Sequence, residues 1–576
     1  MSVMSRTLFC LILASLLAEG ISHAAPPDAG TLLNEQRQPG SRLPDRLPKP
    51  DSPQIERAPL PDKGVKVMVK SFRFTGHDAI ASEAELQALV SASAGRELTY
   101  AELQALAEKV TAFLKEKKGY MLAKAYLPEQ DVTEGVIEIA IVAGRLDDNT
   151  EIRFKAPSRL RAKVLRDMID KVVVPGKPLH TDDIERAMLL MNDLPGIKAQ
   201  AAMEPGSTPG TTKVVINAAE GPLVTGSITA DNQGDRYTGT WRGTGQASAN
   251  DPFGLGDQLS MSLTGAENTF QGRVSYMLPL GSTGLNWSLS YTGLYYKLGG
   301  DMASLNYDGR ADTISTSISY PILRSRTASI WGGLTFEYMM MTDEAGGEKI
   351  KDRKIPVGNA SLTGTFFDSF GGGGMTSANV TLYGGGLDLS GVPASQLQDE
   401  LGPRTSGGFF RATYSLARLQ QLVKGLNFFA SARGQLAGCN LDSSQKFILG
   451  GPSGVRAYPV GESSGDEGHA FTGELRLDLP FMPSWAATQL IGFIDTGWVK
   501  LHYSNWQGAV TSATGRNDSW LSGGGVGLNI GKEGLYSIRA SYARTIDNNK
   551  GRSTTGKDSD NRSDKDRFWL LATVWF

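Results

Sequence analysis

The sequence predicts a membrane β-barrel of about 16 antiparallel strands, preceded by two small α+β domains and a short helix. Three observations predict it: a secretory signal at the start, alternating polar and apolar residues throughout the second half, and a final strand that ends in Phe576. A membrane-spanning helix would need about 18 consecutive apolar residues, and no internal run reaches that length.

Composition limits the classes of function. The 58 basic and 60 acidic residues leave a formal net charge of -2, which argues against a nucleic-acid-binding protein. Many of the 68 glycines lie in the second half beside Ser, Thr and Tyr, a composition typical of strands and turns. A chain of 576 residues is too long for one ordinary core, so several units are expected.

Residues 1–24 are expected to be a secretory signal peptide. Arg6 supplies the positive start, residues 7–18 the apolar stretch, and Ser22-His23-Ala24 the small residues at the cleavage positions. Cys10 precedes most of the apolar stretch, which disfavours a lipoprotein. Cleavage leaves only Cys439, so the mature chain can form no intramolecular disulfide.

Residues 25–38 are predicted to contain a short helix. Asp28 can cap it, Leu32 and Leu33 are its apolar residues, and Pro39 stops it. Residues 39–64 form a proline-rich linker, with seven prolines between Pro39 and Pro61. Composition alone would favour a disordered mature N-terminus over this helix.

Two successive copies of one small α+β layout follow. Residues 65–145 show the order β-α-α-β-β, with strands expected at residues 120–126 and 136–142 and a capping box at Thr99 and Glu102. Residues 146–221 show a similar order, which makes the pair an internal repeat. Each copy should contain an antiparallel sheet with an edge strand.

Residues 222–576 are predicted to form the barrel. Leu259, Met261 and Leu263 alternate with polar residues, as lipid-facing and water-facing positions of a barrel strand do. A soluble β-sandwich would show the same alternation within one strand. The end of the chain favours the barrel, because apolar residues occupy every second position up to a terminal aromatic residue: Phe568, Leu570, Ala572, Val574 and Phe576.

Strand parity predicts which loops lie on which side. In an even-stranded barrel with a periplasmic N-terminal arm, the last strand ends in the periplasm. Counting back places residues 544–567 and 500–519 in outer loops, and residues 531–534 and 480–485 in inner turns. Residues 450–468 then lie on the outer side, and they contain the most unusual local sequence of the chain.

Enzyme and metal motifs lack the context that they need. Residues 461–465 match a nucleophile-elbow pattern, but no α/β sheet or histidine partner accompanies them. The four mature histidines are scattered and a single cysteine cannot form a site, so we expect no enzyme activity, no metal and no cofactor. Asp466 and Glu467 are expected to be solvated loop acids rather than a calcium site.

Two spaced motifs carry a family resemblance. The first is Val455-Arg456-Ala457-Tyr458-Pro459, and the second is Phe493-Ile494-Asp495-Thr496-Gly497. The sequence here resembles the two-partner secretion transporters of the outer membrane, the haemolysin-activator and filamentous-haemagglutinin transporter family. The resemblance implies that the first motif lies on an outer loop that folds back into the lumen, where it meets the second motif on a strand of the wall. The parity count agrees, because it places the first motif between strands 11 and 12 and the second motif on strand 13.

Other segments extend the resemblance over most of the mature chain. It identifies residues 28–38 as a plug helix and the two α+β units as POTRA domains. Residues 119–128 look like the pattern of the family's first POTRA domain, and residues 231–239 like its first barrel hairpin. Ala457 departs from the commoner Gly at its position, so the flexibility of the loop can differ.

The resemblance implies a transporter that recognises an unfolded exoprotein through its POTRA domains in the periplasm and secretes it through the barrel. The expected partners are the cognate exoprotein, outer-membrane lipid and the barrel assembly machinery, for which Phe576 would be the insertion signal. No nucleic-acid partner is expected, and the transporter should be a monomer. The identity of the exoprotein stays open.

Arg456 and Asp495 are predicted to form an ion pair in the lumen, which we call the latch pair. An arginine in a narrow, partly dehydrated lumen needs an acidic partner. Strict alternation places Phe493, Asp495 and Gly497 on the same water-facing side, so Phe493 should pack under the loop. The residues alone also allow Arg456 to be a solvated outer-loop arginine. Alternative functions are an outer-membrane insertase, a barrel enzyme and a passive porin.

Overall fold

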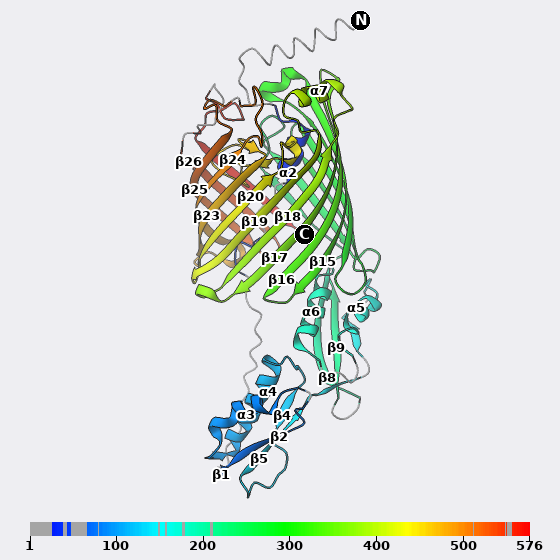
Figure 1. Cartoon of the computed structure of the whole chain (residues 1–576), viewed down its shortest axis with the longest axis vertical. Coiled ribbons are helices and arrows are strands. Elements are labelled where there is room, and N and C mark those ends of the chain that lie inside the picture. Colours follow the sequence, from blue (N-terminus) through cyan, green and yellow to red (C-terminus); the bar gives the residue numbers. More distant parts are fainter. Residues whose placement is uncertain are drawn as a thin grey trace.

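The computed structural model describes residues 26–37, 43–47, 66–78, 80–147, 150–155, 158–174, 179–207, 211–510, 512–547, 549 and 556–576. The predicted signal peptide and most of the predicted linker lie outside them. The described chain forms a tall barrel with two small α+β units arranged in series beyond one of its ends (Figure 1). Among the described residues, no helix is both long and apolar enough to cross a bilayer.

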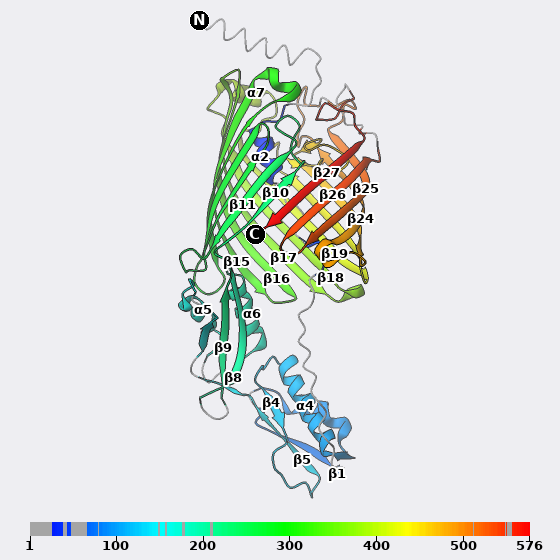
Figure 2. The same ribbon diagram turned by 180° about the vertical axis from the view of Figure 1, so that it is seen from behind.

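The barrel closes through sixteen antiparallel strands, which confirms the predicted fold class. Each strand pairs with the next, and the last strand pairs with the first, as the adjacent β10 and β27 show in Figure 2. The strands are β10 (Val224–Asp231), β11 (Arg242–Asn250), β12 (Gln258–Gly265), β13 (Thr269–Pro279), β14 (Asn286–Lys297), β15 (Tyr307–Arg324), β16 (Ala328–Ala345), β17 (Glu348–Asp368), β18 (Gly374–Leu387), β19 (Gly407–Val423), β20 (Leu426–Ala437), β23 (Glu467–Leu479), β24 (Ala487–Lys500), β25 (Asp518–Lys532), β26 (Tyr536–Thr545) and β27 (Asp566–Trp575).

Alternation along the strands separates an outer from an inner face. Leu259, Met261 and Leu263 of β12 are exposed on the outside, as predicted, whereas Leu294 and Tyr296 of β14 are buried inside. Strands β15, β16 and β17 have 18, 18 and 21 residues. Because about 9–11 residues cross a bilayer, these strands extend beyond it. One barrel end carries long connections, such as residues 388–406 and 438–466, and the other carries short turns, such as residues 325–327 and 424–425.

The first α+β unit, residues 66–144, packs two helices against short strands. The prediction of antiparallel sheets was wrong, because the central strand of each unit, β5 (Val136–Val142) or β9 (Thr211–Glu220), has a parallel as well as an antiparallel neighbour. The Thr99 hydroxyl accepts a hydrogen bond from the Glu102 amide, which confirms the predicted capping box. The strand predicted at residues 120–126 is shorter, because Tyr120 forms an isolated bridge with His180 of the second unit. The elements are β1 (Lys66–Val69), β2 (Ser71–Thr75), α3 (Glu83–Val90), β3 (Arg96–Thr99), α4 (Tyr100–Glu116), β4 (Lys124–Tyr126) and β5 (Val136–Val142).

The second α+β unit connects the first to the barrel. It contains β6 (Arg145–Leu146), β7 (Glu151–Phe154), α5 (Ala162–Ile169), α6 (Thr181–Asn192), β8 (Ile197–Pro205) and β9 (Thr211–Glu220). Asp193 forms a bidentate ion pair with Arg324 at the end of β15, with N–O distances of 2.9 and 2.7 Å. Arg186 donates a hydrogen bond to the Pro321 carbonyl. The unit is thus attached to the short-turn end of the barrel.

Candidate functional site

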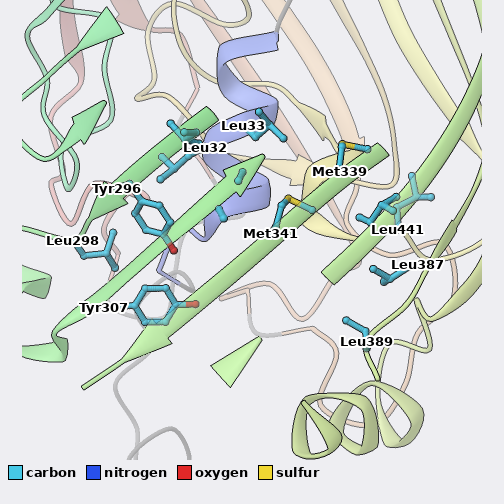
Figure 3. Close-up of a cluster of buried hydrophobic side chains, with 14 of the residues drawn as sticks. Leu32, Leu33, Tyr296, Leu298, Tyr307, Met339, Met341, Leu387, Leu389 and Leu441 are labelled. Atoms are coloured by element: carbon cyan, nitrogen blue, oxygen red, sulfur yellow. The ribbon is translucent and has the colours of Figure 1, made fainter. Parts of the chain in front are cut away.

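A short helix, α2 (Ala29–Arg37), occupies the barrel lumen. Leu32 and Leu33 are 3% and 1% exposed and face the surrounding wall, as Figure 3 shows. Their apolar neighbours include Tyr296, Tyr307, Met339, Met341 and Leu441. Burying each leucine contributes about 1.5–3 kcal/mol, so the apolar face of the helix stabilises its position in the lumen.

Asp28 begins this helix and holds it to the wall. Its carboxylate accepts a hydrogen bond from the Thr31 amide at 2.9 Å, which is the expected N-cap. The same carboxylate lies 3.0 Å from Arg353 and 3.0 Å from Lys351, both on β17. The last predicted residue of the helix, Gln38, lies outside the described residues.

Arg353 is the centre of a buried ionic cluster. It is 1% exposed and pairs with Asp343 at 2.6 Å and with Asp442 at 3.1 Å, in addition to Asp28. Asp343 also accepts a hydrogen bond from the Ala29 amide at 2.9 Å. A buried charge without its partners is strongly unfavourable, so this cluster couples the barrel wall to the N-terminus of the helix.

The loop between β20 and β23, residues 438–466, turns inward against the wall. It contains a small two-stranded sheet, β21 (Phe447–Ile448) and β22 (Ser464–Gly465). Val455, Ala457 and Tyr458 are 0%, 1% and 0% exposed, and Pro459 is also buried. The loop lies between the eleventh and twelfth barrel strands, as the parity count predicts.

Arg456 at the tip of this loop lies on the second motif. Its Nε and Nη2 atoms donate hydrogen bonds to the two oxygens of Asp495, both at 2.8 Å. The guanidinium lies 3.5 Å above the Phe493 ring, so Phe493 packs under the loop. Both partners lie on β24, the thirteenth barrel strand. The structure therefore brings together the two motifs that are 39 residues apart in sequence.

A second carboxylate also binds Arg456. Glu474 on β23 contacts its Nη1 atom at 2.8 Å and pairs with Arg476 at 2.7 Å. Sequence reasoning missed Glu474, Arg476 and the Arg353 cluster. Strand alternation places Glu474, Arg476 and Arg353 on the water-facing side of the barrel wall. It does not tell which charged residues become partners.

Glycines of the wall make room for the loop. Gly497, the last residue of the second motif, would place a Cβ atom only 2.2 Å from Leu449 Cδ1. A Cβ on Gly523 of β25 would lie 2.4 Å from the Cβ of Ala457. The absence of side chains at these positions lets the loop contact the wall.

We expect Gly497→Ala to displace the loop, because the new methyl group would overlap Leu449. Limited proteolysis of the purified protein should cleave within residues 438–466 several-fold faster than in the wild type. Gly492→Ala is the matched control on the same strand, since its Cβ would meet no atom within 4 Å. Equal cleavage of both variants would contradict the assigned packing.

One acid of the loop is buried rather than solvated, and a second is partly buried. Asp466, expected to be a solvated acid, is 0% exposed and lies 2.8 Å from Lys446 and 2.7 Å from the Tyr503 amide. That expectation was wrong because the loop folds inward and removes the carboxylate from water. Burial, together with the neighbouring Asp558, raises the pKa of Glu462 to about 8.

The comparison with protein families matches two parts of the chain. Residues 210–530 match the model "Haemolysin secretion/activation protein ShlB/FhaC/HecB". Residues 67–144 match the model "POTRA domain, ShlB-type". The first match covers more than half of the chain.

Curated relatives and a solved structure are similar to most of the chain. The heme/hemopexin transporter protein HuxB of Haemophilus influenzae strain 86-028NP is 29% identical over 490 residues, covering 84% of this chain and 83% of the relative. The outer membrane transporter CdiB of Escherichia coli is 25% identical over 503 residues, covering 84% and 82%. The solved structure of CdiB from Escherichia coli has a TM-score of 0.66 at 21% identity, covering 100% of this chain and 99% of that chain, which shows a shared fold.

Proposed function

Because the chain belongs to the haemolysin secretion/activation family ShlB/FhaC/HecB, whose members are outer-membrane transporters for partner exoproteins, we propose how its parts perform secretion. The protein is a transporter, not an enzyme, and its cargo is a cognate secreted exoprotein. In the proposal, the two α+β units act as periplasmic POTRA domains that capture the unfolded exoprotein. The plug helix α2 then leaves, the loop with Arg456 shifts, and the exoprotein passes through the barrel as an extended hairpin.

The observation that supports this proposal is the way in which the lumen is closed. Both closing elements, α2 and the inward loop, are held by side-chain contacts and contribute no strand to the barrel wall. They can therefore move while the wall stays intact. A lumen with such removable elements suits a conduit, and folding of the exoprotein outside supplies direction without a nucleotide.

Capture is proposed to occur by strand addition to a sheet edge, which uses main-chain hydrogen bonds. The outer edge of β4 is closed, since the Thr111 hydroxyl bonds both the N–H and the C=O of Ala125. On β8, the Asn192 amide closes the edge at Ala199 in the same way. Because alternate residues of a strand face the same edge, Ala201 should present its N–H outward. We therefore propose that the exoprotein adds to β8 at residues 200–205, beyond the closed position of Ala199.

We expect Ala201→Pro to reduce export several-fold, because proline removes an N–H that faces the free edge without removing a bond to β9. Export is measured as the amount of exoprotein in the medium relative to the amount in the periplasm. Ala201→Val, which keeps the amide, is the matched control and should export normally. Normal export by the proline variant would exclude this edge.

The wider proposal includes the remaining partners. Outer-membrane lipid would surround the exposed apolar face, and the barrel assembly machinery would recognise the last strand through Phe576, which is 64% exposed at the short-turn end. The transporter is proposed to act as a monomer. Deletion of its gene should remove one large protein from the medium, and restoration should return it; an unchanged set of secreted proteins would contradict the proposal.

A further inference from the structure

The short segment of residues 43–47 lies inside the barrel near its short-turn end. It forms neither helix nor strand. Leu43 is 7% exposed and packs against Leu419 and Phe429. Leu47, Met375 and Ala417 complete this small apolar cluster.

The wall under Leu43 is a continuous apolar row. Met375 of β18 pairs directly with Leu419 of β19, which pairs directly with Phe429 of β20. A water-filled lumen is lined by polar side chains, and an apolar row there is stable only when something covers it. In this structure the cover is the chain's own residues 43–47.

Two ion pairs connect the middle of the same segment, Asp45 and Arg46, to the barrel wall. Arg46 contacts Asp478 of β23 at 2.7 Å, and Asp45 contacts Arg539 of β26 at 2.8 Å. Gln489 of β24 donates a hydrogen bond to Asp478 at 3.0 Å. These ion pairs are partly exposed, with side-chain exposures between 27% and 53%, so each is weak and can be exchanged.

The wall therefore provides a site for an unfolded peptide of defined pattern. Two apolar side chains four positions apart fit the row, and an acid and a base between them meet Arg539 and Asp478. The segment contacts the wall through the side chains of Leu43, Asp45, Arg46 and Leu47, and the Asp45 carbonyl accepts a hydrogen bond from Gln489 at 3.5 Å. A competing segment of the same pattern can replace it without rearranging the strands.

The site also adjoins the latch pair. Phe429 lies directly opposite Glu474, which binds Arg456 at 2.8 Å. Arg476 lies 4.2 Å above the Phe429 ring and pairs with Glu474. The Phe429 ring thus contacts Leu43 and also Arg476. Arg476 pairs with Glu474, the second carboxylate that binds Arg456.

We propose that this wall site is the lumenal binding site for the unfolded exoprotein, and that residues 43–47 occupy it as an intramolecular stand-in until transport begins. The ligand class is an unfolded segment with two apolar side chains around an acid–base pair. This inference rests on the proposed secretion function. Residues 43–47 follow α2 in the chain, so their displacement by the exoprotein removes contacts that hold this part of the chain in the lumen and favours departure of the plug helix.

The first experiment uses a peptide as the probe. A fluorescent peptide of residues 41–49 is added to the purified full-length variant Leu43→Ser/Leu47→Ser, whose own segment is weakened. We expect saturable binding, which falls by roughly tenfold when the peptide order is scrambled or when Phe429→Ala is added. Heat-modifiable migration in gels checks that each variant is a folded barrel. Equal binding of the native and scrambled peptides overturns the proposal.

The second experiment tests the exoprotein itself. A photo-crosslinking amino acid replaces Ala417 in cells that are actively secreting. We expect an adduct with the protein whose release into the medium depends on this transporter, and no such adduct in cells that lack that protein. Normal secretion without the adduct overturns this inference and leaves the proposed function standing. Absence of any transporter-dependent secreted protein contradicts the proposed function instead.

Discussion

Arg456→Ala is expected to leave the barrel folded and inserted but to reduce secretion of the cognate exoprotein more than tenfold. The substitution removes the Arg456 side-chain bonds to Asp495, which is 1% exposed, and to Glu474, which is 7% exposed. Breaking a buried pair from one side costs about 3–5 kcal/mol, because the remaining charge stays buried without its counter-charge. Among the described residues, Asp495 then keeps only the Thr472 hydroxyl and the backbone amide of residue 456, whereas Glu474 keeps Arg476. About 1.4 kcal/mol changes an equilibrium tenfold, so the inward position of the loop should lose most of its occupancy.

Two variants make this result specific to the pair. Arg456→Lys keeps the charge but cannot reproduce the two parallel hydrogen bonds to Asp495, so an intermediate loss of secretion is expected. Arg310→Ala is the matched control, since Arg310 is an exposed arginine that pairs with Asp312 on the outer side of the barrel. Secretion in the medium and heat-modifiable migration are measured together. Unchanged secretion by a folded Arg456→Ala transporter would remove the latch pair from the mechanism.

Asp28→Asn should release the plug helix and increase the ion conductance of the purified transporter in planar bilayers. The amide can still cap the helix, but it loses the charge that faces buried Arg353 and Lys351. Arg353 keeps Asp343 and Asp442 as partners, so the substitution removes the ionic bonds of the helix N-terminus to the wall while the rest of the cluster stays intact. Because the substitution leaves the barrel wall unchanged, we expect more frequent open events without a loss of folded protein.

The other end of the same helix supplies the control. Arg37 lies 3.3 Å from Glu337, and its side chain is 33% exposed. A partly exposed pair contributes about 0–1 kcal/mol, so Arg37→Gln should change the conductance little. Closed channels in Asp28→Asn, with conductance equal to that of the wild type, would mean that the remaining contacts retain the helix. These are the apolar contacts of Leu32 and Leu33 and the hydrogen bonds of the Ala29 amide and the Asn34 side chain.

Much of the fold could be predicted because its signals are local. Alternation along single strands predicted the barrel, and the residues Leu259, Met261 and Leu263 are indeed outside. Parity placed the loop with Arg456 between the eleventh and twelfth strands, where the structure has it. The strand predicted at residues 120–126 begins only at Lys124 in the structure. Tyr120 instead pairs with His180 of the second unit, a contact that no local sequence pattern records.

The sequence by itself determined that this protein is a barrel of about sixteen strands with an arm, and that Arg456 needs an acid. Only the tertiary structure decided which charges meet in the lumen. Asp28 and Arg353 are 325 residues apart, and Arg46 and Asp478 are 432 residues apart. The physical reason is that many water-facing positions carry charge, and only closure of the wall brings particular ones within hydrogen-bonding distance. The sequence therefore predicted the conduit, and the packing of its lumen identified what holds it closed.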